Sequence, residues 1–241
     1  MPRKKKSEIV NDEDINEIVN SMGKIKIKTK KIEFTEKQNE LLKIIFDKKT
    51  KIVFISGPAG TSKTFMAIYA ALHLFNMNND YGISYIRSII ESADRGMGAL
   101  PGSIDEKFCP FMMPLTDKLH ELTSPSESRM MLSKNIVSAM PINYLRGASF
   151  KDQVIIADES QNFTTKELIT LLTRIGENTK MLICGDPMQS DINGKSGFQS
   201  ITSAFDDEDS ANQGIYNFHF THKDIKRSEI LKYIVKKLEE L

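Results

Sequence analysis

The residues with the clearest chemical meaning are Lys63 and Thr64, which close a loop of small residues between two apolar runs. Residues 51–56 precede this loop and residues 65–75 follow it, as expected for a strand and a helix. Backbone N–H groups of such a loop bind phosphate, helped by the positive end of the following helix. Lys63 is predicted to reach the β- and γ-phosphates of a nucleoside triphosphate, and Thr64 to hold Mg²⁺. The loop residues are Gly57, Pro58, Ala59, Gly60, Thr61 and Ser62.

This loop departs from the usual pattern G-x-x-x-x-G-K-[ST] at one position. Gly57 is in place, but Ser62 stands where the second glycine belongs, and Gly60 is an extra glycine inside the loop. A serine adds a Cβ where the backbone passes close to the phosphates. A strand-to-helix turn without a ligand therefore stays open as an alternative, as does a module that binds nucleotide without hydrolysing it.

Two carboxylates end a second apolar run. Residues 154–157 read Val-Ile-Ile-Ala, which is typical of a buried parallel strand, and Asp158 and Glu159 follow. Asp158 suits a direct or water-mediated Mg²⁺ contact. Glu159 can orient and deprotonate an attacking water. The structural alternative is a pair of exposed carboxylates that favour the dipole of a helix start.

A third apolar run, residues 180–184, ends in the turn Gly185-Asp186-Pro187-Met188-Gln189. Gln189 is predicted to touch the γ-phosphate or the attacking water, unless the segment is an ordinary Gly-Asp-Pro turn. In a parallel sheet, ligands bind outside the carboxyl ends of the strands. Each of the three motifs falls at such an end, so we expect them to meet.

Strands that alternate with helices along the chain predict an α/β fold, a mostly parallel sheet with helices on both faces. Residues 1–34 are expected to be a basic N-terminal arm that holds a short helix over residues 12–22, with an edge strand or extended segment after it. Residues 35–241 are expected to form a single domain. Residues 90–125 contain several Gly and Pro residues, so we expect a mostly irregular functional loop or lid with one or two helices in it. Residues 206–209 predict an acidic loop.

Composition narrows the class of protein. A net charge of +1 with 40% hydrophobic residues fits a globular domain. No apolar stretch approaches the roughly 20 residues that span a bilayer, and no apolar core follows the basic residues 3–6, so we expect neither a membrane span nor a secretory signal. Cys109 and Cys184 are far apart, which fits the reducing cytoplasm. His219 and His222 have no cysteine pair near them, so zinc is not indicated.

The motifs together look like motifs one, two and three of superfamily-one helicases, and the chain more closely resembles the PhoH family of ATPases. This resemblance implies a RecA-like P-loop NTPase core that uses ATP and Mg²⁺. It implies RNA or single-stranded DNA as the polymer of a helicase- or translocase-like motor. Ser62 and Ser160, the latter in place of the commoner alanine, put the rate of hydrolysis in doubt. The second RecA-like domain of a full helicase is not expected, because too few residues follow Asp191. The stretches that carry the resemblance are residues 57–64, 100–102, 144–150, 158–164, 172–176 and 185–191.

Gln38 and Arg87 are further candidates. Gln38 resembles the adenine-reading glutamine of helicases, but it also completes a capping box with Thr35, three residues earlier. Arg87 lies near the end of a predicted strand over residues 83–89 and matches an arginine of the family. It is predicted to meet phosphate or nucleic acid, with a solvated surface charge as the alternative.

A lone RecA-like core lacks an arginine that neutralises γ-phosphate charge in the transition state, and a neighbouring subunit can supply one. The candidates are Arg146, Arg174 and Arg227. We expect Arg174 or Arg146 to act across a subunit boundary and Arg227 to act as a sensor within its own subunit. The chain is therefore expected to form a homo-oligomer, a hexameric ring in the first instance.

Nucleic-acid contacts are expected from two regions. The lysines of residues 4–6 and 24–31 can bind a phosphate backbone, or be a solvated surface. Phe108, Phe111 and residues 112–113 can form a loop that stacks on bases, or pack in the core.

Four functions compete. The first is an ATPase linked to nucleic acid, and the second is a phosphoryl transferase such as a kinase. The third is a metal-dependent nuclease that uses Asp158, Glu159, Asp186 and Asp191, and is indifferent to Lys63. The fourth is a binding switch with little hydrolysis. Phosphate release with and without single-stranded RNA or DNA separates them.

Overall fold

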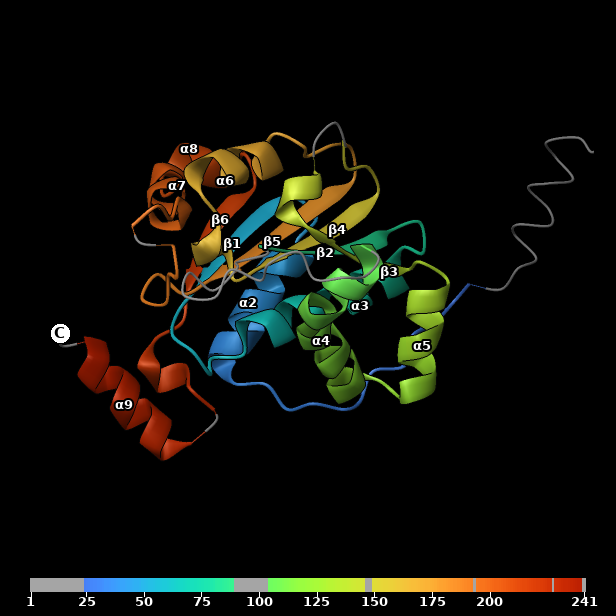
Figure 1. The fold of residues 1–241 in the computed structure, drawn as a ribbon, viewed down its shortest axis with the longest axis horizontal. Helices are drawn as coiled ribbons and strands as arrows, with labels where there is room; N and C mark the ends of the chain where they lie inside the picture. The colour runs from blue at the N-terminus through green and yellow to red at the C-terminus, as the bar shows by residue number, and fades with distance from the viewer. Residues whose placement is uncertain (1–23, 89–103, 146–148, 193, 227, 240–241) are drawn as a thin grey trace, which may run out of the picture.

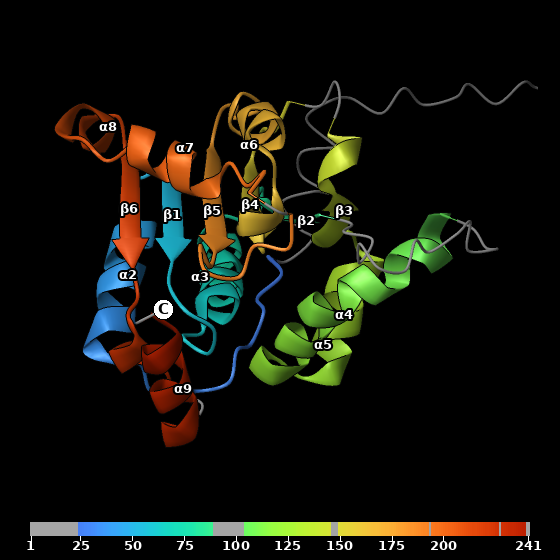
Figure 2. The same cartoon turned by 60° about the vertical axis from the view of Figure 1, so that its left-hand side comes forward.

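Six strands form one sheet in which all neighbouring strands are parallel. The computed structural model describes residues 24–88, 104–145, 149–192, 194–226 and 228–239. The strand order is β3-β2-β4-β5-β1-β6, and the arrows point the same way in Figure 2. The predicted α/β fold with a parallel sheet is confirmed. The strands are β1 (Ile52–Ser56), β2 (Gly82–Arg87), β3 (Val137–Pro141), β4 (Gln153–Asp158), β5 (Thr179–Gly185) and β6 (Ile215–His219).

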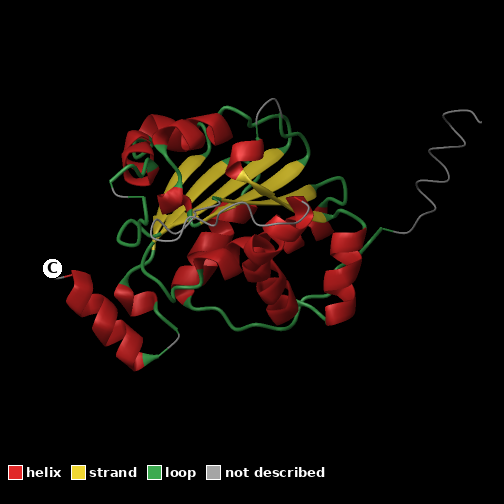
Figure 3. Ribbon diagram, in the orientation of Figure 1, coloured by secondary structure: helices red, strands yellow, loops and turns green. Residues whose placement is uncertain are grey.

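Helices cover both faces of the sheet (Figures 1 and 3), because alternate residues of each strand enter different cores. Val53 and Ile55 pack with one helical layer, whereas Ile52 and Phe54 pack with the other. The first layer holds α2 (Glu36–Phe46), α3 (Lys63–Met77), α4 (Ile104–Leu122) and α5 (Pro125–Ser133). The second layer holds α6 (Thr165–Leu172) and α7 (Phe198–Ala204).

Local sequence explains where several helices begin. Thr164 caps α6 in a capping box with Glu167, and Thr35 caps α2 in the same way with Gln38. Ser124 caps α5, which has Pro125 in its first turn. Shorter helical segments are η1 (Ile142–Tyr144), η2 (Ser160–Asn162), η3 (His222–Asp224) and α8 (Glu208–Asn212), and the last helix is α9 (Glu229–Glu239).

The end of α2 is fastened by a lysine of the sheet. Lys180 of β5 is buried, and its Nζ donates to the carbonyl oxygens of Ile45, Asp47 and Thr50 at 3.0, 2.6 and 2.7 Å. These are among the carbonyls that a helix end and the turn after it leave without partners. Lys180 therefore holds α2 in place beside the strand that leads to the Gly57–Thr64 loop.

Residues 24–34 form the N-terminal arm in the described part of the chain, and they are extended rather than an edge strand. Ile27 is buried, and its backbone exchanges two hydrogen bonds with the Asn76 side chain. The Lys28 amide donates to Glu127 Oε1 at 2.7 Å, and the Lys30 amide to the Leu122 carbonyl at 2.8 Å. The arm thus lies along α3, α4 and α5. The helix predicted over residues 12–22 and the lysines at 4–6 lie outside the described residues.

Two segments are more regular than expected. Within residues 90–125, where one or two helices were expected, α4 is a helix of 19 residues. Leu115, Leu119 and Leu122 recur on one side of it and are buried, so packing on the sheet outweighs the prolines that obscured the pattern. Residues 206–209 are not a plain loop, because the Asp207 side chain caps α8. Within the described residues, no helix has both the length and the apolar character to cross a membrane.

Candidate functional site

The loop between β1 and α3 has the backbone of a phosphate-binding turn, with positive φ at three positions. Gly57 has φ 144°, and a Cβ there would lie 2.6 Å from the Phe220 carbonyl oxygen. Gly60 has φ 85°, and Ser62 has φ 68° and ψ 26°. Ser62 therefore adopts the left-handed conformation that suits the glycine of the usual pattern.

Lys63 begins α3 and folds back over the loop. Its Nζ donates to the carbonyl oxygens of Gly57 and Pro58 at 2.6 and 3.0 Å. The ammonium group thus lies inside the loop, where the phosphates of a nucleotide would compete with these carbonyls for it. Contact of Lys63 with the β- and γ-phosphates stays a prediction.

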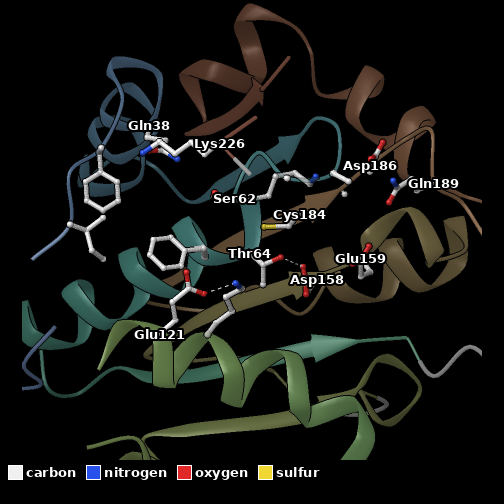
Figure 4. Close-up of a pocket in the computed structure, with 18 residues that line it drawn as sticks. Gln38, Ser62, Thr64, Glu121, Asp158, Glu159, Cys184, Asp186, Gln189 and Lys226 are labelled. Atoms are coloured by element: carbon white, nitrogen blue, oxygen red, sulfur yellow. Dashed lines mark hydrogen bonds and ion pairs between the residues drawn. The ribbon is translucent and has the colours of Figure 1, made fainter. Parts of the chain in front are cut away.

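A hydrogen bond joins Thr64, in the first turn of α3, to Asp158, the last residue of β4. Thr64 Oγ1 donates to Asp158 Oδ1 at 2.6 Å (Figure 4). Tyr85 Oη donates to Asp158 Oδ2 at 2.5 Å. Asp158 and Tyr85 are buried. Burial, and then the neighbouring Asp158 carboxylate, raise the pKa of Tyr85 above its ordinary value, so the phenol stays a neutral donor. A hydroxyl and a carboxylate oxygen are ligands that Mg²⁺ prefers.

Glu159 follows β4 with φ 50° and ψ 42°, a strained conformation for a residue with a side chain. Its Oε2 accepts a hydrogen bond from Gln161 Nε2 at 2.7 Å, and its Oε1 lies 3.9 Å from Arg87 Nη2. Glu159 and Asp158 thus have different hydrogen-bond partners. Their roles as base and metal ligand stay predictions.

Gln161 ties the second motif to the third. It is buried, and its Oε1 accepts from the Asp186 amide at 3.0 Å, while its Nε2 also reaches the Gln189 carbonyl oxygen at 3.4 Å. A single amide therefore connects Glu159 with the segment that follows β5. The sequence alone indicates no role for Gln161, because a glutamine in a polar turn gives no sign of its distant partners.

The end of β5 is packed tightly beneath the site. A Cβ on Gly185 would lie 2.8 Å from the Phe198 ring, so only glycine fits there. Cys184 is buried, and burial raises its thiol pKa well above the ordinary value. The thiol therefore serves as a small apolar group in the wall of the site.

These groups surround a cavity of about 570 Å³ (Figure 4). That volume is in the range of small-ligand sites. Lys118 and Glu121 of α4, an ion pair at 2.6 Å, reach the cavity, and so does Lys226. None of these three was predicted, because the segments around them show no chemical motif. Also lining the cavity are Ile32, Phe34, Gln38, Ala59, Gly60, Ser62, Lys63, Thr64, Phe65, Asp158, Glu159, Cys184, Gly185, Asp186 and Gln189.

Gln38 takes part in the cap of α2 and also faces the cavity. Its Oε1 accepts from the Thr35 amide at 3.1 Å, and its own amide donates to Thr35 Oγ1 at 3.2 Å, so the capping box is confirmed. Gln38 also lines the cavity beside the N-terminal arm. Recognition of adenine by Gln38 stays a prediction.

Arg174 lies away from this cavity. Its carbonyl oxygen accepts from the Phe150 amide at 2.9 Å, and Phe150 lies just before β4, at the amino ends of the strands. Its buried Nε has no hydrogen-bond partner among the described residues. Arg146 and Arg227 lie outside the described residues, as do residues 100–102. The side chains of Phe108 and Phe111 are not described, but both residues belong to α4 and not to a loop.

The carboxylate cluster of the nuclease alternative is not gathered in the described part of the chain. Asp191 Oδ2 accepts from Asn162 Nδ2 at 3.1 Å, and the Asp191 amide donates back to Asn162 Oδ1 at 2.8 Å. Among the described residues, no three His, Cys, Asp or Glu side chains are placed to hold a metal ion together. A Mg²⁺ ion at Thr64 and Asp158 would depend on phosphate oxygens and water for its remaining ligands, which is its usual habit.

Thr64 meets Asp158 at the carboxyl edge of a parallel sheet, and this fold and site together are those of the P-loop NTPase class. The family whose description reads "PhoH-like protein" matches residues 27–239, so the chain belongs to the PhoH family. This confirms the resemblance seen in the sequence.

Several curated proteins are similar over most of this chain. A PhoH-like protein of Mycobacterium tuberculosis is 33% identical over 186 residues, which are 76% of this chain and 51% of that protein. A PhoH-like protein of Synechocystis is 31% identical over 207 residues, 85% of this chain and 61% of that protein. Protein PhoH of Escherichia coli is 35% identical over 159 residues, 65% and 44% respectively. The chain thus spans about half the length of the curated relatives it matches.

The matching solved structures share less sequence identity with this chain than the curated proteins do. The Pif1 helicase of Candida albicans matches 79% of this chain and 41% of its own, with 17% identity and a TM-score of 0.38. The flagellar accessory protein FlaH of Methanocaldococcus jannaschii matches 88% and 77%, with 13% identity and a TM-score of 0.28.

Proposed function

We propose that this chain binds ATP with Mg²⁺ in the cavity and hydrolyses it, coupled to single-stranded RNA or DNA as in a helicase- or translocase-like motor. The observation that carries this proposal is the 2.6 Å contact between Thr64 Oγ1 and Asp158 Oδ1, which joins residues 94 apart in sequence. Two oxygen ligands from separate motifs meet there, beside Lys63 and Glu159.

Each group of the site then has one task. Lys63 leaves the carbonyls of its own loop for the β- and γ-phosphates, while Thr64 and Asp158 hold Mg²⁺, which supplies positive charge against the phosphates. Glu159 accepts the proton of the attacking water. Gln189 contacts the γ-phosphate or that water. Gln161 positions both Gln189 and Glu159 through the hydrogen bonds of its side-chain amide.

Coupling to nucleic acid is supported by charge on the N-terminal arm. Lys24, Lys26, Lys28, Lys30 and Lys31 are exposed, whereas Ile27 between them is buried. A row of lysines on an anchored segment is suited to a phosphate backbone. The motif resemblance to superfamily-one helicases points to the same partner. We place the protein in the cytoplasm on its family and its cysteine usage.

The test is phosphate release by the purified chain, together with the affinity for ATP, with and without single-stranded RNA or DNA. Lys63→Ala should lower affinity or turnover at least tenfold, equivalent to about 1.4 kcal/mol. Glu159→Gln keeps the shape but not the base, so it should bind ATP normally and turn over on the order of 100-fold more slowly. Lys151→Ala, an exposed lysine at the amino ends of the strands, should behave as the unmutated chain.

Two results would contradict the proposal. Undiminished hydrolysis in the Lys63→Ala protein would place the activity elsewhere. Loss of ATP binding in the Glu159→Gln protein, with turnover of the residual complex unchanged, would mean that Glu159 binds nucleotide and is not the base.

A binding switch with little hydrolysis is the second candidate, and Ser62 favours it. Its Cβ lies in the loop where phosphates approach, in a strained conformation. The switch predicts tight ATP binding with turnover that Glu159→Gln barely changes. The nuclease alternative predicts strand cleavage without ATP that Lys63→Ala leaves intact.

A further inference from the structure

Arg87 ends β2 beside the site, and its Cα is paired in register with that of Asp158. Its Nη2 lies 3.9 Å from Glu159 Oε1, with side chains 26% and 40% exposed. The other carboxylate oxygen, Oε2, is held by the buried Gln161. Glu159 therefore has two unlike partners. The amide is fixed in the interior, whereas the guanidinium is partly in solvent and able to change partner.

The ion pair lies at the boundary of the cavity. Glu159 lines the cavity, but Arg87 does not. A nucleotide in the cavity would thus meet Glu159, whereas Arg87 lies outside the lining and is open to a different anion. Guanidinium groups bind phosphate oxygens in a fork of two hydrogen bonds, so a phosphodiester is a strong competitor for Arg87.

We propose that the Arg87–Glu159 ion pair restrains Glu159, and that a backbone phosphate of single-stranded nucleic acid releases it by taking Arg87. Competition for one cation then couples the polymer to the water-activating carboxylate. The inference rests on the proposed function, because Glu159 is the base and nucleic acid the partner there. Thermodynamic linkage makes the coupling reciprocal, so whatever removes the Glu159 charge must tighten polymer binding at Arg87.

The reciprocal effect can be measured without hydrolysis. The affinity for a labelled 20-mer of uridylate is measured by fluorescence anisotropy, at fixed salt and without nucleotide. Glu159→Gln should tighten binding about two- to fivefold, which is the range of exposed ion pairs in double-mutant cycles. Arg87→Ala should weaken binding, and in that background Glu159→Gln should have no further effect.

A matched control comes from Lys151 and Glu177, an exposed ion pair at 3.3 Å at the amino ends of the strands. Glu177→Gln removes the same charge as Glu159→Gln but far from Arg87. Its effect on affinity should be smaller, and equal in the presence and absence of Arg87. This control separates the effect of breaking the Arg87–Glu159 ion pair from the effect of the change in net charge.

The outcomes are distinct. Equal effects of Glu159→Gln with and without Arg87 overturn the inference and leave the proposed function standing. Tenfold weaker ATP binding by Arg87→Ala also overturns it, since Arg87 would then be a ligand of the nucleotide. Absence of binding to both single-stranded RNA and DNA removes nucleic-acid coupling and this inference together, while phosphate release from the same preparations still tests the ATPase. A rise in polymer-free turnover in Arg87→Ala, with unchanged ATP affinity, supports it.

Discussion

At the scale of single residues, Ser62 places a side chain in a conformation that glycine adopts freely. Its φ of 68° costs about 1–2 kcal/mol for a residue with a Cβ. Glycine removes that strain but adds freedom to the unfolded chain, which offsets roughly 0.5–1 kcal/mol. Ser62→Gly should therefore raise the free energy of unfolding by up to about 1 kcal/mol in urea titrations. Ser62→Ala keeps the Cβ and should not raise the free energy of unfolding. Equal stabilisation by both variants would contradict the interpretation that the Ser62 backbone is strained.

Tyr85 is a second residue whose effect can be isolated, because its hydroxyl holds the side chain of Asp158. Tyr85→Phe removes that donor and should weaken the Mg²⁺ dependence of ATP binding about tenfold, as loss of a group that orients a metal ligand does. Binding measured in EDTA should change little. Since burial raises the pKa of Tyr85, the difference should be the same at pH 6 and pH 9. A loss of affinity that is equal with and without Mg²⁺ would make Tyr85 a packing residue only.

At the scale of elements, the contact between the N-terminal arm and α3 is sensitive to acid. His73 Nε2 lies 3.2 Å from Thr29 Oγ1, and burial lowers the pKa of His73 below its ordinary 6.5. The folded state thus binds the proton less readily than the unfolded state. Neutral His73 therefore makes its full contribution to the free energy of unfolding above about pH 6.5. That contribution is lost as the pH falls through the pKa of His73 in the folded state.

The expected result is a free energy of unfolding that falls from pH 7.5 to pH 5 more steeply in the unmutated chain than in His73→Gln. Denaturant titrations at several pH values measure it. A stability that rises on acidification, or two identical pH profiles, would show that His73 makes no such contribution.

Elements differ in how far the sequence could predict them. The strands β1, β4 and β5 are continuous apolar runs, so their pattern needed no tertiary context. The length and position of α4 could not be predicted, because Pro110 and Pro114 interrupt the local signal and packing of Leu115 and Leu119 outweighs them.

The site shows the same division between local pattern and distant contact. Lys63, Thr64 and Asp158 were predicted because each follows a strand in a recognisable motif. Tyr85 was not, since it reads as an ordinary strand residue and its partner Asp158 is 73 positions away. Lys118 and Glu121 were not predicted either, because they belong to no chemical motif and only the packing of α4 brings them to the cavity.

At the scale of the whole molecule, the position of Arg174 leaves the cavity of another subunit as the one on which it could act. It lies near the amino ends of the strands, whereas the cavity lies at the carboxyl ends, so it cannot serve its own site. We predict that turnover per subunit rises with protein concentration in a homo-oligomer, most simply a hexameric ring. Stabilisation in trans by an arginine is worth roughly 10³–10⁵ in rate. Lys63→Ala mixed with Arg174→Ala should recover part of the turnover that each lacks alone.

Arg146→Ala provides the parallel mixture, since Arg146 is the other candidate in trans. Light scattering on the same samples gives the mass of the assembly. A monomer whose hydrolysis is independent of protein concentration would contradict catalysis by an arginine of a neighbouring subunit. Full activity of both single arginine variants would contradict it as well.

The packing of the N-terminal arm also has a consequence for biosynthesis. Lys28 is translated 99 residues before Glu127, the side chain that its amide contacts. At about 5–20 residues per second, Ile27 waits on the order of 5–20 seconds before the chain that covers it is complete. During that interval the nascent chain exposes an apolar segment flanked by lysines. Until the arm docks, this apolar segment is therefore open to non-native contacts that the folded chain excludes.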